Sequence, residues 1–200
     1  MKILLCAFDP FGGESINPAL EAVKAAKVDG VELTKAEIPT VFYKSNEKAT
    51  ALIDEILPDA VIMIGQAGGR AQVTPERVAI NISDASIDDN DGNRPSDEPI
   101  ESGAPTAYFS SLPIKKIVER LKAEGIPAAV SNSAGTFVCN HLMYGVLHHI
   151  AKNGLKTVAG FIHIPYLPEQ VENKENMPSL PLDVSVKAVE TAVKVVAGLI

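Results

Sequence analysis

Short apolar runs alternate with amphipathic segments along the chain, and this alternation limits the possible folds more than any other feature. Apolar residues recur at helical spacing in some segments and form continuous or alternating runs in others. The N-terminal part is predicted to form strand, helix, strand, helix and strand, over residues 2–7, 17–27, 31–38, 43–57 and 60–64. Such a β-α-β-α-β order is typical of an α/β protein with a parallel sheet.

The rest of the chain continues the pattern. We predict further strands at residues 76–82, 127–130 and 157–163, and helices at 113–123, 139–152 and 182–199. We therefore expect the α/β fold class: a single domain over residues 1–200, built as a three-layer α/β/α sandwich around a mixed, largely parallel twisted sheet. In such folds the functional groups gather at the carboxyl ends of the strands.

One long segment, residues 84–112, does not fit the pattern. It is acidic and rich in glycine and proline. Its length favours a lid over the site or a contact between subunits, and disorder is the alternative for so polar a segment.

Composition limits the partners and the location. The chain has 200 residues, 46% of them hydrophobic, and a formal net charge of -7. A negative surface repels nucleic acids and anionic membranes, so we expect neither as a partner. The N-terminal apolar run is too short for a signal peptide, and no run has the length of a spanning helix. We expect a cytoplasmic protein whose two cysteines remain thiols.

Cys139 stands at the predicted start of a helix. It could be a small buried hydrophobe packed against the sheet, which is the usual role of a free cysteine. Alternatively, the unpaired backbone N–H groups and the helix dipole there would lower the pKa of its thiol and make it a nucleophile. The same N–H groups could bind an oxyanion.

A thiol nucleophile needs a base, and His163 ends a predicted strand, where an α/β fold presents catalytic groups. His163 could also merely cap that strand. Glu76 could orient the imidazole as a third member, or it could form a salt bridge with Arg70 or Arg77. Because His141 is two residues from Cys139, it points to another side of the helix.

Other motifs are weaker. The sequence GQAGGR lacks the Lys-Ser/Thr of a phosphate loop, and DDNDGN is out of register for a calcium loop. His148 and His149 have no third ligand nearby and are expected at the surface or an interface. We expect no metal site, and we expect Cys6 to be packed and inert.

Five motifs together, FDPFGG, NPAL, GQAGGRAQVTPERVAIN, SAGTFVCNHLMYG and GFIHIPYLPEQ, resemble pyroglutamyl peptidase I, the pyrrolidone-carboxylate peptidases. The resemblance covers nearly the whole chain in order. It implies a cysteine exopeptidase that removes N-terminal pyroglutamate from peptides through a thioester, without a cofactor and as a homotetramer. The family's catalytic residues fall on Cys139, His163 and Glu76, and the backbone N–H of Cys139 is implied to hold the oxyanion.

The resemblance also implies a substrate site. Pyroglutamate is a small neutral lactam, so apolar walls and a few hydrogen-bonding groups should bind it. The implied residues are Phe8, Phe11, Asn17, Gln66 and Phe137. The alternative for the three phenylalanines is burial in the core.

One departure from the family pattern is Ser86, which stands where the family usually has an arginine. Its absence could reduce catalytic efficiency without affecting the triad. Two alternative functions therefore remain open from the sequence. One is a protein that binds pyroglutamyl or related lactam ligands with reduced catalysis, and the other is a phosphorylase-like enzyme that uses GQAGGR for phosphate.

Overall fold

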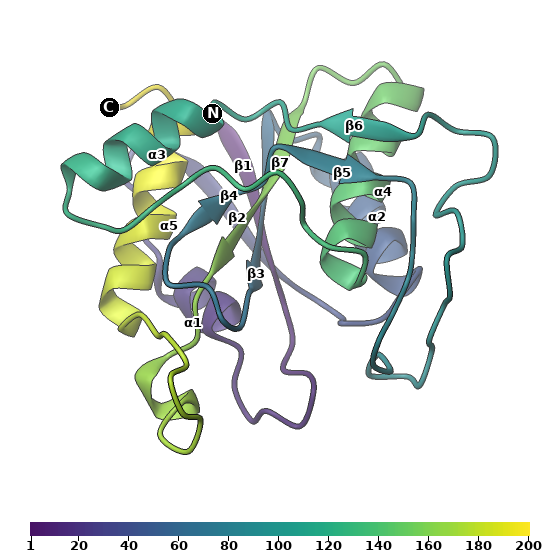
Figure 1. Ribbon diagram of the computed structural model, residues 1–200. Coiled ribbons are helices and arrows are strands. Elements are labelled where there is room, and N and C mark those ends of the chain that lie inside the picture. Colours follow the sequence, from purple (N-terminus) through teal and green to yellow (C-terminus); the bar gives the residue numbers. More distant parts are fainter.

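A five-stranded sheet forms the centre of the molecule in a computed structural model that describes residues 1–200 (Figure 1). The strand order is β2-β1-β3-β7-β4, and only β4 is antiparallel to its neighbour. The strands are β1 (Lys2–Phe8), β2 (Glu32–Ile38), β3 (Ala60–Gln66), β4 (Thr74–Pro75) and β7 (Val158–Ile164). The predicted mixed, largely parallel sheet is confirmed.

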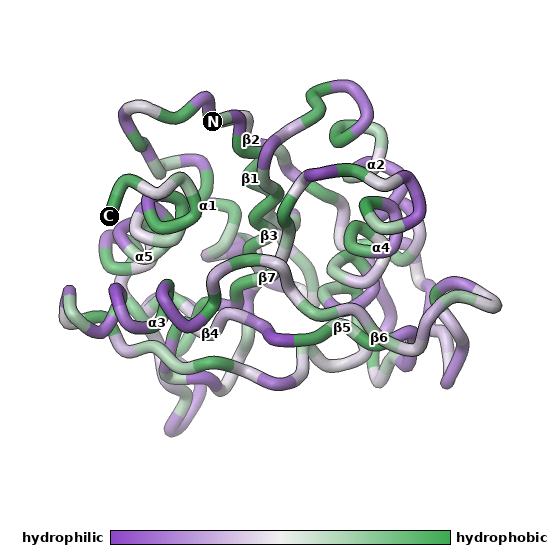
Figure 2. The backbone as a smooth tube through the Cα atoms, turned by 90° about the horizontal axis from the view of Figure 1, so that it is seen from above, coloured by the Kyte–Doolittle hydropathy of each residue, from purple (hydrophilic) through white to green (hydrophobic).

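Helices cover both faces of this sheet (Figures 1 and 2). One face carries α1 (Pro18–Ala25), α3 (Ile114–Ala123) and α5 (Leu182–Val196). The other carries α2 (Lys44–Ile56) and α4 (Val138–Lys152). The predicted helices therefore exist, with ends that differ by a few residues, and the three-layer architecture is confirmed.

The apolar strands are buried on both faces because their side chains alternate between two cores. On β3, Ile62 and Ile64 pack under α1 and α5, whereas Val61 and Met63 pack under α4. Period-two alternation explains why a strand between two helical layers is apolar throughout. Because of this alternation, each polar residue at the end of a strand faces one particular helical layer.

Two predicted strands were wrong in detail. Residues 76–82 do not form one strand, because the chain leaves the main sheet after β4 and forms β5 (Val78–Ile80) in a separate hairpin with β6 (Ala107–Phe109). Strand β6 was not predicted. Residues 127–130 form only an isolated bridge, Val73 to Ala128, where the proline at 127 cannot donate a ladder hydrogen bond.

The acidic segment 84–112 is structured by local hydrogen bonds. The Asp89 carboxylate accepts bonds from the backbone N–H groups of Phe42, Asp91 and Asn93. Asn90 donates to the carbonyl of Pro10 in the loop after β1. The segment thus lies against loops at the carboxyl end of the sheet.

None of the helices has the length and apolar character needed to cross a membrane.

Candidate active site

The register of β4 against β7 brings Glu76 to His163. Thr74 pairs with His163, and the backbone N–H of Glu76 donates to the carbonyl of Phe161 at 2.8 Å. Opposed residues of an antiparallel pair point to the same face, and diagonal neighbours are close enough to interact. Glu76 and His163 are such diagonal neighbours, on the face that α4 covers.

A single carboxylate oxygen of Glu76 makes two charge-assisted contacts. Its Oε1 lies 2.7 Å from His163 Nδ1 and 2.6 Å from Arg70 Nη1. The Glu76 side chain is fully buried. Because an ionised carboxylate only accepts hydrogen bonds, His163 carries its proton on Nδ1 and leaves the Nε2 lone pair free to take a proton. The two sequence interpretations of Glu76, histidine partner and salt bridge to Arg70, are both realised.

Helix α4 brings the thiol of Cys139 to the same face. A Cβ placed on Gly65 would lie 3.3 Å from Cys139 Sγ, and Gly65 is the register partner of His163 on the neighbouring strand. The thiol therefore lies beside the strand position next to the imidazole, and a side chain at residue 65 would collide with the Phe161 ring, 2.6 Å from that Cβ. The structure brings the three predicted catalytic residues together from β7, from α4 and from the link between β4 and β5.

The start of α4 also leaves backbone donors free. Helix α4 begins at Val138, and Phe137 precedes it without any side chain that caps the first turn. Phe137 accepts a bond from the N–H of His141, so the N–H groups of the preceding residues have no partner within the helix. The N–H of Cys139 is one of these groups, as an oxyanion site requires.

The protonation states differ from the sequence prediction. Burial raises the pKa of the Cys139 thiol to about 12, and the Glu76 charge adds to this, while Arg70 acts in the opposite direction. Burial also lowers the pKa of His163, and Glu76 offsets only part of that effect. The backbone N–H of Cys139 does lower the thiol pKa, as predicted for a helix start, but desolvation outweighs it, so the predicted net lowering was wrong. Both shifts favour a neutral thiol and a neutral imidazole in the resting site.

Glu76 remains ionised despite its burial. Burial alone would raise the pKa of this carboxyl, but hydrogen bonds from His163 and Arg70 outweigh it and hold the pKa below its usual range. Arg70 has a side chain that is 30% exposed, so it brings positive charge from the surface to the buried carboxylate. Its second nitrogen, Nη2, donates to the carbonyl of Ser133 in the loop before α4.

Two of the three predicted phenylalanines form an aromatic wall beside Cys139. The rings of Phe11 and Phe137 have centroids 6.2 Å apart, and both are partly exposed. Phe42 supports Phe137 from behind with an edge contact at 5.3 Å. Phe8 is only 2% exposed and packs on Phe161 in the core. Its placement matches the alternative interpretation of burial more closely than a pocket wall.

Of the two predicted polar residues, Asn17 hydrogen-bonds the backbone and Gln66 hydrogen-bonds another side chain. Asn17 caps α1 by accepting the N–H of Ala19, and it donates to the carbonyl of Asp9. Gln66 ends β3 on the face of α1, and its Oε1 accepts a bond from Gln170. Direct contact of either side chain with a substrate stays a prediction.

The residues next to Cys139 in the sequence have structural roles. Asn140 hydrogen-bonds the backbone of Ile80 and Ile82 and fixes the β5 segment. His141 is fully buried between Ser83 Oγ and the backbone N–H of Tyr43. Neither is hydrogen-bonded to the predicted catalytic residues, which for His141 agrees with the prediction from its spacing.

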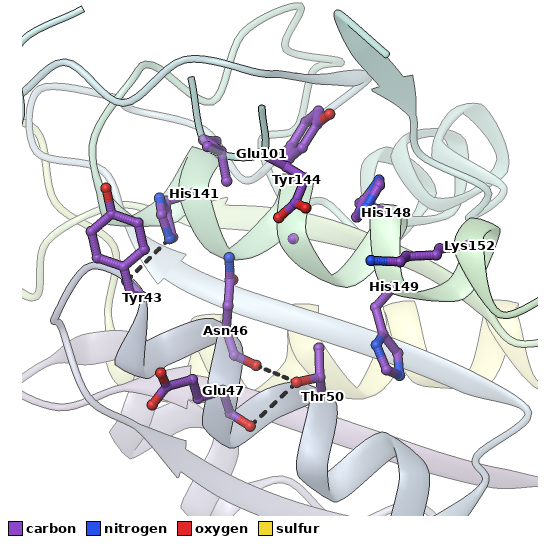
Figure 3. A pocket seen from close by; sticks show the side chains of 12 residues that line it. Tyr43, Asn46, Glu47, Thr50, Glu101, His141, Tyr144, His148, His149 and Lys152 are labelled. Carbon is purple, nitrogen blue, oxygen red and sulfur yellow. Dashed lines mark hydrogen bonds between the residues drawn. The ribbon is translucent and has the colours of Figure 1, made fainter. Parts of the chain in front are cut away.

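A surface hollow lies between α2 and α4, away from the triad (Figure 3). Its lining includes His148 and His149, which are half-buried rather than fully at the surface. His148 contacts the Tyr108 hydroxyl, and His149 pairs with Asp54. Cys139, His163 and Glu76 are not among the lining residues. The three predicted catalytic residues therefore lie outside this hollow.

Ser86 lies exposed in the acidic segment, close to another arginine. Arg94 donates through Nη2 to the carbonyl of Ser86 and through Nε to that of Ala85. A guanidinium is thus present at this segment although residue 86 is serine. This pairing could not be predicted from the sequence, because it depends on how the loop folds back on itself.

The sequence model of one family, pyroglutamyl peptidase, matches residues 1–198. The chain belongs to this family. Pyrrolidone-carboxylate peptidase of Thermoanaerobacter sp. is 59% identical over 199 residues, covering 98% of each chain. Pyrrolidone-carboxylate peptidase 1 of Caldanaerobacter subterraneus is 60% identical over 198 residues, again covering 98% of each. The family resemblance expected from the motifs is confirmed.

Solved structures of the pyroglutamyl peptidase family share the fold. Pyroglutamyl peptidase I of Bacillus amyloliquefaciens superposes with a TM-score of 0.94 at 52% identity, covering 98% of this chain and 97% of that chain. A mutant pyrrolidone carboxyl peptidase of Pyrococcus furiosus gives 0.95 at 44% identity, covering 100% and 99%. The chain is therefore a cysteine-type hydrolase of this family by both sequence and structure.

Thiol reactivity tests the electrostatics of the site. Glu76→Gln removes the charge that raises the Cys139 pKa, so alkylation by iodoacetamide at pH 8 should become severalfold faster. Arg70→Met removes the charge that lowers this pKa, so alkylation should become slower. In the parent protein the rate should keep rising with pH above 9, because the thiol pKa is about 12. The measurement is the rate of mass gain on intact protein.

The Cys139→Ser variant supplies the background from Cys6, which is fully buried. A parent rate that is already at a plateau below pH 8 would contradict the neutral resting pair. It would indicate a preformed thiolate and imidazolium instead.

Proposed function

We propose that the protein is a cysteine exopeptidase, an omega peptidase that hydrolyses the N-terminal pyroglutamyl residue from peptides, with Cys139, His163 and Glu76 as its catalytic residues. The single domain over residues 1–200 carries all of the machinery. The observation that supports this most strongly is the contact of Glu76 Oε1 with His163 Nδ1 at 2.7 Å. This contact leaves Nε2 as the base on the face where the thiol lies.

The first half-reaction begins from neutral groups. His163 Nε2 removes the proton from Cys139 Sγ as the sulfur attacks the pyroglutamyl carbonyl carbon, so that charge forms only with the new S–C bond. The backbone N–H of Cys139 donates to the oxygen that becomes negative. Glu76 stabilises the imidazolium that forms. His163 then gives its proton to the leaving amine, the C–N bond breaks, and a thioester remains.

The second half-reaction restores the thiol. A water molecule loses a proton to His163 and attacks the thioester carbonyl, and the S–C bond breaks. The sulfur takes back the proton, and free pyroglutamate leaves. No metal or cofactor is required by these steps, since every proton moves between the substrate, water and His163.

The aromatic wall suits a lactam. Phe11 and Phe137 offer apolar ring surface beside Cys139, and a neutral ring needs no fixed counter-charge. We assign Phe8, Asn17 and Gln66 to the same substrate site at a greater depth. Their contacts support a role in shaping the pocket, by packing under it and by fixing the loop after β1 and the end of β3.

Two alternatives are weaker for specific reasons. A phosphorylase would need the cation of GQAGGR for phosphate, but Arg70 is bound to Glu76. A lactam-binding protein without catalysis would not need the Glu76–His163 pair or a thiol beside it. The serine at 86 leaves the triad unaltered, and Arg94 supplies a guanidinium at that segment.

We also propose a cytoplasmic homotetramer. A nucleophilic thiol persists in a reducing compartment, where disulfides do not form. Phe109 on the edge strand β6 is 72% exposed, and large exposed side chains on a sheet edge favour contact with another subunit. The end of the 84–112 segment would then be an interface, and its beginning, against the loop after β1, would border the site.

Turnover of a fluorogenic pyroglutamyl amide tests the function. The parent should release the fluorophore without added phosphate, because water is the acceptor. Cys139→Ser should lower kcat/KM by at least about a thousandfold, since the serine hydroxyl is a much weaker nucleophile here than the thiol. Cys6→Ser is the matched control and should retain the parent rate. Normal turnover by Cys139→Ser, or turnover that depends on phosphate, would reject the proposal.

Assembly is tested by light scattering. The parent should have four times the mass of the 21.2 kDa chain. Phe109→Asp places a charge on the exposed edge and should lower the mass. The control is Leu57→Asp, which places the same charge on an exposed position at the C-terminal end of α2 and should leave the mass unchanged. A parent of single-chain mass would contradict the tetramer.

A further inference from the structure

Gln170 is a buried glutamine that joins three separate parts of the chain. It closes the short helix η1 (Pro168–Gln170), which follows β7, and its side chain is only 7% exposed. Its amide contacts the end of β3 and the loop after β1. We call residues 9–16 of that loop the Phe11 loop, since they carry the aromatic ring that faces Phe137.

Backbone hydrogen bonds fix the orientation of this amide. The N–H of Leu167 points at one amide atom of Gln170 at 3.0 Å. A backbone N–H can only donate, so the atom it meets must be Oε1 and the opposite atom must be Nε2. The orientation of Gln66 then follows. Gln170 Nε2 lies 2.9 Å from the Gln66 amide, which must present its Oε1.

The second hydrogen of Gln170 Nε2 points to the Phe11 loop. The carbonyl of Ile16 and the carboxylate Oε2 of Glu14 both lie 3.4 Å away. Lys174, four residues after Gln170, forms an ion pair with the same carboxylate. All acceptors around Nε2 are oxygens, so only a donor group is tolerated at this position. Gln170 thus ties the end of β3 and the Phe11 loop to the segment that follows β7.

Contacts on either side of the tip must hold the Phe11 loop in position, because two glycines form the tip itself. Gly12 and Gly13 have φ values of +64° and +81°, with no atom near their Cβ positions. The loop is anchored before the tip, where Asp9 accepts bonds from Thr40. After the tip, Gln170 and Lys174 supply the second anchor. The position of Phe11 therefore depends on two anchors, and Gln170 is the buried part of the second.

We propose that Gln170 is a positioning residue for substrate binding, which sets the Phe11 loop and the end of β3 at the distance that a pyroglutamyl ring requires. This inference rests on the proposed function. Gln170 lies across the sheet from the triad, because its partner Gln66 points to the α1 face whereas Phe161 and His163 point to the α4 face. Its loss should therefore weaken binding and leave the chemical step largely intact.

Steady-state kinetics on a pyroglutamyl amide separate these effects. Gln170→Leu keeps the volume but removes the donor, and KM should rise roughly tenfold, equivalent to about 1.4 kcal/mol, while kcat changes less than about threefold. Gln72→Leu is the matched control, because Gln72 is exposed on the link between β3 and β4. Its kinetics should equal those of the parent.

Gln170→Glu gives a readout that a purely structural role would not produce. A protonated glutamic acid can still donate to Gln66 and accept from Leu167, whereas the ionised form faces the Glu14 carboxylate and the Gln66 oxygen. Burial and the Glu14 carboxylate should raise the pKa of the new carboxyl more than the Lys174 ammonium, which is already paired with Glu14, lowers it. KM should therefore be near the parent value at pH 5.5 and rise with pH, while KM of Gln170→Leu should be raised throughout.

Each outcome decides the proposal. A pH-dependent KM in Gln170→Glu supports it even if Gln170→Leu fails to fold. Parent-like KM in both variants at all pH values overturns it and leaves the proposed function intact. A fall in kcat with unchanged KM also overturns it, because that would place Gln170 in the chemical step. A parent without turnover overturns both proposals.

Discussion

The site depends on one buried carboxylate oxygen that has two cationic or potentially cationic partners. Glu76 Oε1 accepts from His163 at 2.7 Å and from Arg70 at 2.6 Å. Burial raises the pKa of this carboxyl, His163 contributes most to holding it low, and Arg70 adds to that effect. Without His163, the pair would be an ordinary salt bridge at the edge of the sheet. Together they fix the tautomer of His163 and make its outer nitrogen a base.

The sheet supplies the geometry that this oxygen needs. Strand β4 is only two residues long, yet its antiparallel pairing with β7 places Glu76 diagonal to His163. Gly65 on β3 leaves space for the Phe161 ring, and the thiol of Cys139, at the start of α4, borders the same space. Desolvation in this packed arrangement raises the pKa of the thiol and lowers that of the imidazole, which favours the neutral form of both. The thiol and the imidazole therefore ionise as the sulfur attacks the substrate and not before.

Much of this could be predicted from the sequence, since it depends on local patterns. Alternating apolar and helical segments predicted the layers, and the positions of Cys139 at a helix start and His163 at a strand end pointed to the chemistry. The break between β4 and β5 could not be predicted, because the apolar alternation continues across Glu76. The link from Gln170 to Gln66 spans 104 positions and leaves no periodic signal. The thiol pKa was mispredicted because burial depends on tertiary packing.

A covalent intermediate on Cys139 tests the central claim most directly. An activated pyroglutamyl ester, used in excess, should acylate the protein faster than water removes the acyl group. Acid quenching followed by peptide mass spectrometry should find one pyroglutamyl group on the peptide that contains Cys139 and none on the peptide that contains Cys6. Release of pyroglutamate with no adduct on Cys139, or with the adduct on another side chain, would contradict the account.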